Sequence, residues 1–350
     1  MNIMQYCRWG AGVVWAVALL AAPPGFSQTN ASADRVVQPV NVRKLSGISL
    51  DVGQQAETLD GVTRISDVIY GRKFGMALTM DVLIPAKPNK GAVVWAVSGG
   101  FHSSHADMSG PGFVQYMKAL LDRGYTVFAV VHGSNPKFNM RDISADMHRA
   151  VRFIRYHAGD FGIDGNRIGI SGASAGGSIS LWIGTQGGAG NAAAKDPVER
   201  ESSKAQAVAC FYPGVDWVNW EKDGSTCMAI TRKRGLIEAF RFRDYDPVKQ
   251  EFVEETDPKK IDAILADCSP INHVSAGSAP TLLVQGDGDP VVRLEPAVLM
   301  VEKLKAAGVA AELVIKEGKG HGWSGQDQDL KLFADWYDEH LRNPAGKAKP

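Results

Sequence analysis

Short, wholly apolar runs alternate with amphipathic segments from Pro85 onwards, and this alternation is the strongest constraint on what the chain can fold into. Residues 93–97 (VVWAV) and 125–131 (YTVFAVV) are the first two runs, and residues 167–170 (RIGI) are the third. Each run is too short and too apolar for a solvent-facing helix, so each predicts a strand that is buried on both faces. Such strands, separated by helices, indicate an α/β protein with a mostly parallel central sheet flanked by helices.

Apolar residues recur at helical spacing in two of the intervening segments, around residues 113–121 and 143–154. Gly124 follows the first segment and is expected to cap that helix. Further apolar runs predict three more strands, at residues 207–212, 281–284 and 312–315. Upstream, residues 62–70 and 77–83 alternate in polarity around the turn-like sequence GRKFG, which predicts an N-terminal antiparallel hairpin.

We expect one α/β domain over residues 61–342. Residues 28–60 are rich in Gln, Ser and Asn without clear periodicity and are interpreted as a linker or loosely docked arm. Residues 216–267 interrupt the strand and helix pattern with aromatic and charged residues, so we expect a small lid-like insertion there. Residues 343–350 form a polar tail.

The first 27 residues are typical of a signal peptide. Arg8 lies in a short polar start, and an apolar stretch runs from Ala11 to Ala22 before PPGFS. A membrane-spanning helix needs about 20 apolar residues, so this stretch is too short for stable membrane insertion. We expect cleavage after Ser27 and export to the periplasm or the medium, and Cys7 precedes the apolar stretch, which excludes the arrangement for lipid attachment.

Composition excludes several function classes. Apolar residues make up 45% of the chain and charged residues 22%, which favours a globular fold. The 38 basic and 38 acidic residues give no net charge, so no nucleic-acid partner is expected. The expected mature chain keeps three cysteines: Cys227 and Cys268 are the candidate disulfide, and Cys210 is interpreted as a buried free thiol. No Cys/His spacing indicates a metal site.

Ser174 is the candidate nucleophile, within Gly172-Ala173-Ser174-Ala175-Gly176. This pentapeptide pattern alone is weak evidence. Here it directly follows a predicted strand and precedes a small-residue helix start, which is the setting of a nucleophile elbow. In so tight a turn, Cβ atoms at Gly172 and Gly176 would collide with neighbouring backbone, and Ser174 would adopt a strained conformation that exposes its hydroxyl.

A serine hydroxyl needs a base to take its proton and an acid to orient that base. With an elbow serine, the acid and then the histidine follow it along the chain. His273, His321 and His340 all follow Ser174, but only His321 lies in a glycine-rich loop between a strand and a helix. We therefore select His321.

Two aspartates compete for the role of the acid. Asp287 and Asp289 both follow the strand predicted at residues 281–284, at its carboxyl end. Asp289 is preferred because the Pro and Val residues after it can anchor the loop on the core, whereas Asp287 is better suited to capping the turn.

The oxyanion formed during acyl transfer needs backbone N–H donors. The sequence Ser98-Gly99-Gly100-Phe101 follows the first parallel strand, where such donors are expected. Gly100, Phe101 and Ala175 are the candidate donors.

These motifs resemble the α/β-hydrolase superfamily, in particular the hormone-sensitive-lipase-like carboxylesterases and the bifunctional feruloyl and acetyl xylan esterases. The resemblance spans roughly residues 62–341, and its most specific part is the stretch DFGIDGNRIGISGASAGG at 160–177, with a further likeness at 67–85. It implies a serine esterase that forms an acyl-enzyme on a small-molecule or polysaccharide-linked ester, such as an acetyl or feruloyl ester, with no cofactor or metal. The predicted signal peptide adds the expectation that this esterase is exported.

One residue departs from the family pattern. The family has His-Gly-Gly in the oxyanion loop, whereas this chain has Ser98, whose hydroxyl is expected to brace the loop. For His102, His105 and His132, surface or hydrogen-bonded loop roles are favoured over lining the pocket. Two other functions stay open: a serine peptidase of the prolyl-oligopeptidase type, and a non-catalytic binding protein on a hydrolase scaffold.

Overall fold

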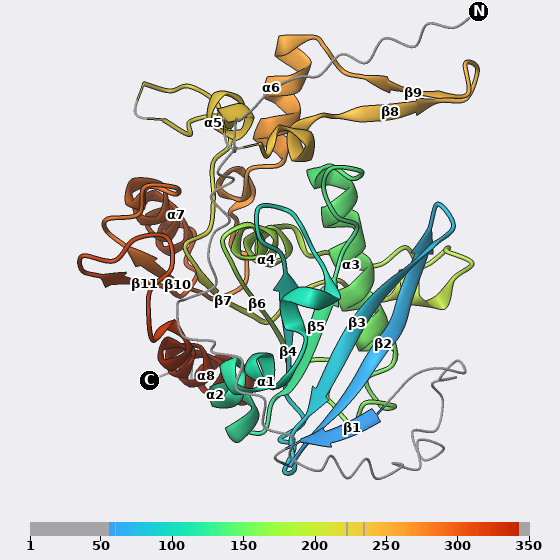
Figure 1. The fold of residues 1–350 in the computed structure, drawn as a ribbon, viewed down its shortest axis with the longest axis vertical. Coiled ribbons are helices and arrows are strands. Elements are labelled where there is room, and N and C mark those ends of the chain that lie inside the picture. The colour runs from blue at the N-terminus through green and yellow to red at the C-terminus, as the bar shows by residue number, and fades with distance from the viewer. Residues whose placement is uncertain (1–55, 60, 222, 234, 343–350) are drawn as a thin grey trace, which may run out of the picture. The chain divides into compact units, whose positions relative to one another are not determined.

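The predicted apolar runs form one central sheet in the computed structural model, which describes residues 56–59, 61–221, 223–233 and 235–342. Strands β5, β4, β6, β7, β10 and β11 pair in parallel, each with the next (Figure 1). Strands β1, β2 and β3 pair antiparallel, and β3 joins β5 antiparallel as well. The mostly parallel α/β sheet is therefore confirmed. In spatial order, the strands are β1 (Ala56–Leu59), β2 (Val62–Lys73), β3 (Met76–Ile84), β5 (Thr126–Val131), β4 (Ala92–Val97), β6 (Ile168–Ala173), β7 (Ala207–Phe211), β10 (Thr281–Gly286) and β11 (Ala311–Lys316).

The N-terminal hairpin of β2 and β3 is confirmed, with a shorter turn than expected. Lys73 pairs with Met76, so only Phe74 and Gly75 form the turn. Both have positive φ, 48° and 74°, which is what a two-residue hairpin turn requires. Strand β1 is not among the predicted strands. It falls at the end of the expected arm and pairs antiparallel with β2.

Helices cover both faces of the sheet. Strand side chains alternate between the faces, so Val94 and Ala96 of β4 join one apolar cluster and Val93, Trp95 and Val97 join the other. The first cluster includes residues of α3 (Met140–Tyr156), α4 (Ala175–Gln186) and α7 (Leu294–Ala306). The second includes residues of α1 (Pro111–Tyr116), α2 (Lys118–Asp122) and α8 (Gln326–Arg342).

The helix expected around residues 113–121 is divided in two. Met117, between α1 and α2, has φ −80° and ψ 0°, outside the α-helical region, and its side chain is fully buried. Gly124 ends the segment with φ +85°, and a Cβ there would lie 2.6 Å from the carbonyl oxygen of Lys87. The role of this glycine as a cap is therefore confirmed.

The expected insertion lies between β7 and β10. Its strands pair only with each other, and Phe240 and Phe242 are buried in the apolar cluster of α3 and α4. In Figure 1 the insertion is drawn in yellow and orange. Its elements are α5 (Cys227–Lys233), the 3₁₀ helix η4 (Ile237–Phe240), β8 (Arg243–Asp246), β9 (Glu251–Glu254) and α6 (Pro258–Asp267); the other described 3₁₀ helices are η2 (His105–Met108), η3 (Pro197–Arg200) and η5 (Pro270–His273).

The disulfide expected between Cys227 and Cys268 is not present. Both are buried free thiols, as is Cys210. Burial raises the pKa of Cys268 to about 12 and raises the pKa of the other two thiols further, so all three stay protonated near neutral pH. A buried, protonated thiol is a poor nucleophile for disulfide exchange.

Three predicted segments fall outside the described residues. They are the signal peptide at 1–27, nearly all of the arm at 28–60, and the tail at 343–350. Among the residues that are described, no helix combines the length and apolar character that crossing a bilayer requires.

Candidate active site

Ser174 lies on the sharp turn between β6 and α4, with φ 54° and ψ −120°. Neither neighbouring glycine has room for a side chain. A Cβ at Gly172 would lie 2.4 Å from the carbonyl carbon of Gly176, and a Cβ at Gly176 would lie 2.4 Å from the carbonyl oxygen of Ala96 in β4. The tight approach of helix to strand therefore requires both glycines and holds the serine in its strained conformation.

The structure brings Ser174, His321 and Asp289 together. His321 Nε2 lies 2.8 Å from Ser174 Oγ, and His321 Nδ1 lies 2.8 Å from Asp289 Oδ2. The carboxylate can only accept, so Nδ1 carries the proton and Nε2 is free to accept the serine hydroxyl. Both side chains are buried, with 6% of His321 and none of Asp289 exposed.

Asp289 is positioned by its own loop. Its Oδ1 accepts hydrogen bonds from the amides of Val291 at 2.7 Å and Val292 at 3.0 Å, which leaves Oδ2 for the imidazole. Asp287 does not reach His321. Its carboxylate accepts from the amide of Gly318 at 2.7 Å and so connects the acid loop to the histidine loop.

Three backbone amides near Ser174 have no acceptor among the described residues: those of Gly100, Phe101 and Ala175. Gly100 and Phe101 both have positive φ, 55° and 65°, after the end of β4. Ala175 is the first residue of α4, where backbone N–H groups are unpaired and the helix dipole is positive. Unpaired donors beside a serine hydroxyl are suited to a developing oxyanion.

The expected role of the Ser98 hydroxyl is wrong. It is buried and has no hydrogen-bond partner in the described part of the chain. Ser103 braces the loop instead, because its hydroxyl donates to the carbonyl of Val97 at 2.5 Å and accepts from the amide of His132 at 3.2 Å. The backbone N–H of Asn135 adds a bond to the carbonyl of Phe101 at 3.1 Å.

None of the three loop histidines lines the cavity at Ser174. His132 is buried, its Nδ1 faces the carbonyl of Gly133 at 2.9 Å, and burial lowers its pKa to about 4. His102 is exposed, and its backbone bridges to Gly99. His105 contacts the N-terminal hairpin through Thr79 Oγ1 at 2.6 Å.

His105 also belongs to the one group of side chains in the described region that could hold a metal ion, together with Asp67 and Asp81. Arg64 donates to Asp81 Oδ2 at 2.8 and 2.5 Å, so this carboxylate already has a cationic partner. Burial alone would raise the pKa of Asp81, but bonds from His105, the Asp67 amide and Arg64 outweigh it and lower that pKa. The cluster therefore resembles an ion-pair network.

Tyr212 is a site residue that the sequence reasoning missed. Its ring packs against the His321 imidazole with centroids 4.5 Å apart, and its hydroxyl donates to Gln326 at 3.0 Å. Its φ is +34°, directly after β7. Its position as the last residue of the strand predicted at 207–212 was the only signal that could have found it. His273 and His340 lie in η5 and α8, outside the site.

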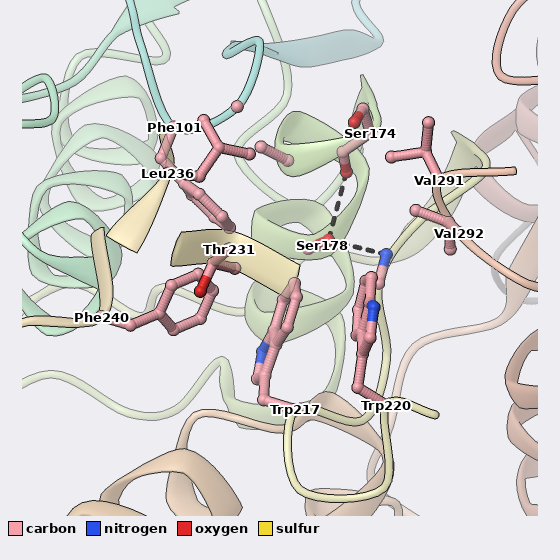
Figure 2. Close-up of a pocket in the computed structure, with 13 residues that line it drawn as sticks. Phe101, Ser174, Ser178, Trp217, Trp220, Thr231, Leu236, Phe240, Val291 and Val292 are labelled. Carbon is pink, nitrogen blue, oxygen red and sulfur yellow. Dashed lines mark hydrogen bonds between the residues drawn. The ribbon is translucent and has the colours of Figure 1, made fainter. Parts of the chain in front are cut away.

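A cavity of about 50 Å³ opens beside Ser174. Figure 2 shows Ser174 near the top of the view and the indoles of Trp217 and Trp220 near the bottom, with Ser178 between them. The two indoles stack with centroids 5.1 Å apart and an interplanar angle of 9°. The residues lining the cavity are Gly100, Phe101, Ser174, Ala175, Ser178, Gly214, Trp217, Trp220, Thr231, Leu236, Phe240, Val291 and Val292.

The sequence is similar to a known protein family and to curated esterases. Residues 80–304 match the model of the family described as BD-FAE. Esterase LipC of Mycobacterium tuberculosis is 26% identical over 208 residues, which are 59% of this chain and 47% of that protein. The chain thus spans about half the length of this curated relative.

Two solved structures share the fold. An acetyl ester-xyloside bifunctional hydrolase from Caldicellulosiruptor lactoaceticus is 23% identical with a TM-score of 0.61, over 78% of this chain and 96% of that one. A butyrate-bound esterase from Thermogutta terrifontis is 23% identical with a TM-score of 0.58, over 83% of this chain and 97% of that one. The α/β-hydrolase fold implied by the sequence is therefore confirmed.

Proposed function

We infer, from the premise that this chain belongs to the BD-FAE family, that it is an exported serine carboxylesterase that hydrolyses carboxylic esters through an acyl-enzyme. The observation that carries the proposal is the continuous hydrogen-bonded chain from Ser174 Oγ through His321 to Asp289, with both contacts at 2.8 Å. These distances lie within the range that proton transfer between a nucleophile and its base requires.

The reaction begins with attack of Ser174 Oγ on the ester carbonyl carbon while His321 Nε2 takes the hydroxyl proton. The imidazolium then donates that proton to the leaving alcohol oxygen as the C–O bond breaks and the acyl-enzyme forms. Water then attacks the acyl carbonyl carbon while Nε2 takes its proton. The bond from that carbon to Ser174 Oγ breaks, the imidazolium returns the proton to Oγ, and the acid is released with the enzyme restored. Asp289 keeps the imidazole in the productive tautomer and stabilises its charged form.

Negative charge develops on the carbonyl oxygen in each step. The unpaired amides of Gly100, Phe101 and Ala175 are the donors proposed to stabilise it, and removal of one such donor typically costs about 10²–10³ in rate. Because main-chain amides do this work, the unpartnered hydroxyl of Ser98 is compatible with activity.

An ester is the proposed substrate because the relatives are esterases. LipC is named an esterase, and a further relative, 25% identical, is an ethyl acetate hydrolase of Pseudomonas putida. The acetyl ester-xyloside hydrolase supports an ester linked to a polysaccharide as one natural form of the substrate. Small-molecule esters share the same scissile bond.

The test compares p-nitrophenyl acetate with an aminoacyl-proline anilide, using wild type and Ser174→Ala. The proposal expects wild type to hydrolyse the ester, and expects the Ser174→Ala rate to fall by about 10⁶, to background. Cleavage of the anilide alone would instead identify a serine peptidase, and a folded wild-type protein inactive on both would favour a binding protein.

Export is proposed from the segment at 11–22 and the small residues that follow it. The expected mature protein begins at Gln28. N-terminal sequencing of protein from the periplasm or medium tests this expectation, and an intact Met1 in the cytoplasmic fraction would contradict it.

A further inference from the structure

We propose that the cavity beside Ser174 is an acyl pocket restricted to short, uncharged acyl groups, of acetyl to propionyl size, with Trp220 and Leu236 of the segment after β7 setting the length limit. This inference rests on the proposed esterase function. It assigns the substrate class of that site and excludes a feruloyl group from it.

The position of the cavity identifies the half of the ester that it holds. Gly100, Phe101 and Ala175, the candidate oxyanion donors, all line it, so it begins where the carbonyl oxygen would bind. His321 does not line it. The leaving alcohol must receive its proton from His321 Nε2 and therefore lies on the other side of the carbonyl carbon. The acyl group is the part that enters the cavity.

The volume of the cavity sets the first limit on the acyl groups that it can bind. An apolar cavity of ~150 Å³ is known to hold a benzene molecule. The cavity beside Ser174, at about 50 Å³, has roughly a third of that volume. The carbonyl group and one or two further carbons fill that space. A feruloyl group, with an aromatic ring on a propenoyl linker, is several times too large.

Hydrogen bonds and close packing hold in place the two tryptophans that line the cavity. Trp217 is almost fully buried, and its indole Nε1 donates to the carbonyl of Cys268 at 3.0 Å. Arg293 donates twice to the carbonyl of Trp220, at 3.0 and 2.7 Å, and so holds the backbone of the second indole. A Cβ at Gly214 would lie 2.5 Å from Trp217 Cη2, so the rings already touch the backbone behind them.

Leu236 forms the wall beside the oxyanion loop. A Cβ at Gly100 would lie 2.9 Å from Leu236 Cδ2, which shows how closely this side chain covers the loop. Figure 2 shows Leu236 beside Phe101, on the opposite side of the cavity from Val291 and Val292. An acyl chain that lengthens along this wall meets this leucine, and one that lengthens towards the stacked indoles meets Trp220.

The absence of charged lining residues sets the second limit on the acyl groups that the cavity can bind. None of the residues lining the cavity in the described structure is charged. The hydroxyl of Thr231 donates to the carbonyl of Met228 at 3.2 Å, and that of Ser178 is bonded to the backbone of Ser174 and Gly214 at 3.1 and 2.9 Å. No side chain is left to neutralise an ammonium or a carboxylate, and burial of an unpaired charge is costly. Aminoacyl and dicarboxylic monoacyl esters are therefore excluded.

The experiment measures kcat/KM for p-nitrophenyl esters from acetate to octanoate, and for methyl ferulate. We expect wild type to prefer acetate and propionate, with kcat/KM falling about 10–200-fold once the chain exceeds the cavity. Trp220→Ala is expected to raise kcat/KM for hexanoate and lower it for acetate. Leu236→Ala is a second enlarging variant that keeps the test valid if loss of the indole prevents folding.

Phe252→Ala is the matched control. Phe252 is an exposed aromatic residue of the same insertion, in β9, and does not line the cavity, so its acyl-length profile should equal that of wild type. Comparable kcat/KM for acetate, octanoate and methyl ferulate in wild type would overturn the inference while leaving the esterase proposal intact. An unchanged profile in both folded enlarging variants would also overturn it. Failure of folded wild type on every ester would overturn the proposed function itself.

Discussion

Replacement of the acid tests how the loop at Asp289 orients the histidine. In Asp289→Asn, one side-chain atom must still accept the amides of Val291 and Val292, now 2.7 and 3.0 Å from Oδ1. The amide oxygen is the only atom of the new group that can accept, so it takes that place and its NH₂ group turns towards His321 Nδ1. Nδ1 must then become the acceptor.

The consequence is a change of tautomer. With Nδ1 deprotonated, the neutral imidazole carries its proton on Nε2, which faces Ser174 Oγ at 2.8 Å and can no longer accept the hydroxyl proton. In the best-studied triad, the same substitution lowers kcat by about 10⁴, which corresponds to about 5 kcal/mol of transition-state stabilisation. We expect a loss of that order in kcat and little change in KM.

Asp287→Asn is the control from the same loop. Its carboxylate accepts only from the amide of Gly318 among the bonds described, at 2.7 Å, and an amide oxygen can accept the same bond. We expect kcat within about tenfold of wild type, a change of ~1.4 kcal/mol. The assay is kcat and KM on p-nitrophenyl acetate, with circular dichroism to verify folding. A tenfold or smaller loss in Asp289→Asn, or equal losses in both variants, would refute the proposed role of Asp289.

Three further predictions concern stability and thiol chemistry. Gly176→Ala places a Cβ 2.4 Å from a β4 carbonyl oxygen and should lower the free energy of unfolding by about 1–3 kcal/mol or more. Gly159→Ala is the control, because a Cβ there has nothing within 4 Å, and it should change that free energy little. Similar urea midpoints for the two variants would contradict this prediction. Hydrogen bonding to Asp81 raises the pKa of His105, so its contribution to stability is complete below the ordinary pKa of 6.5 and is lost as pH rises through the raised value. The urea midpoint of wild type should therefore fall more between about pH 6 and about pH 9 than that of His105→Gln, and equal falls would argue against the network. Finally, a thiol reagent at about pH 8 should leave Cys210, Cys227 and Cys268 unmodified in the native protein, since burial keeps them protonated. After denaturation of a chain that begins at Gln28, and so lacks Cys7, the reagent should titrate three thiols, and a missing pair would reveal a disulfide among them.

The parts of the fold predicted from sequence are those with a strong local signal. The strands after Pro85 are apolar on both faces, so their runs stand out, and the glycines around Ser174 are required by contacts of 2.4 Å that follow from the turn itself. Asp289 was separated from Asp287 by the residues that follow it. In the structure, the amides of Val291 and Val292 bind the Asp289 carboxylate, and Asp289 rather than Asp287 contacts His321.

The parts that were not predicted depend on contacts between distant residues. Nothing near Ser98 indicates that Ser103 rather than Ser98 braces the oxyanion loop, because the acceptor and donor come from the ends of two strands. Trp217 and Trp220 were visible only as aromatic residues without periodicity. Their stacking depends on how the insertion folds back over α4, which no local pattern encodes.

Reaction of the native protein with a fluorophosphonate, followed by peptide mass mapping, tests the central claim most directly. A fluorophosphonate reacts with a serine that a neighbouring base has activated, whatever the natural ester is. The account predicts one adduct per chain, on the peptide that contains Ser174, and no adduct in folded Ser174→Ala. An unlabelled but folded wild-type protein, or an adduct that persists in Ser174→Ala, would contradict it.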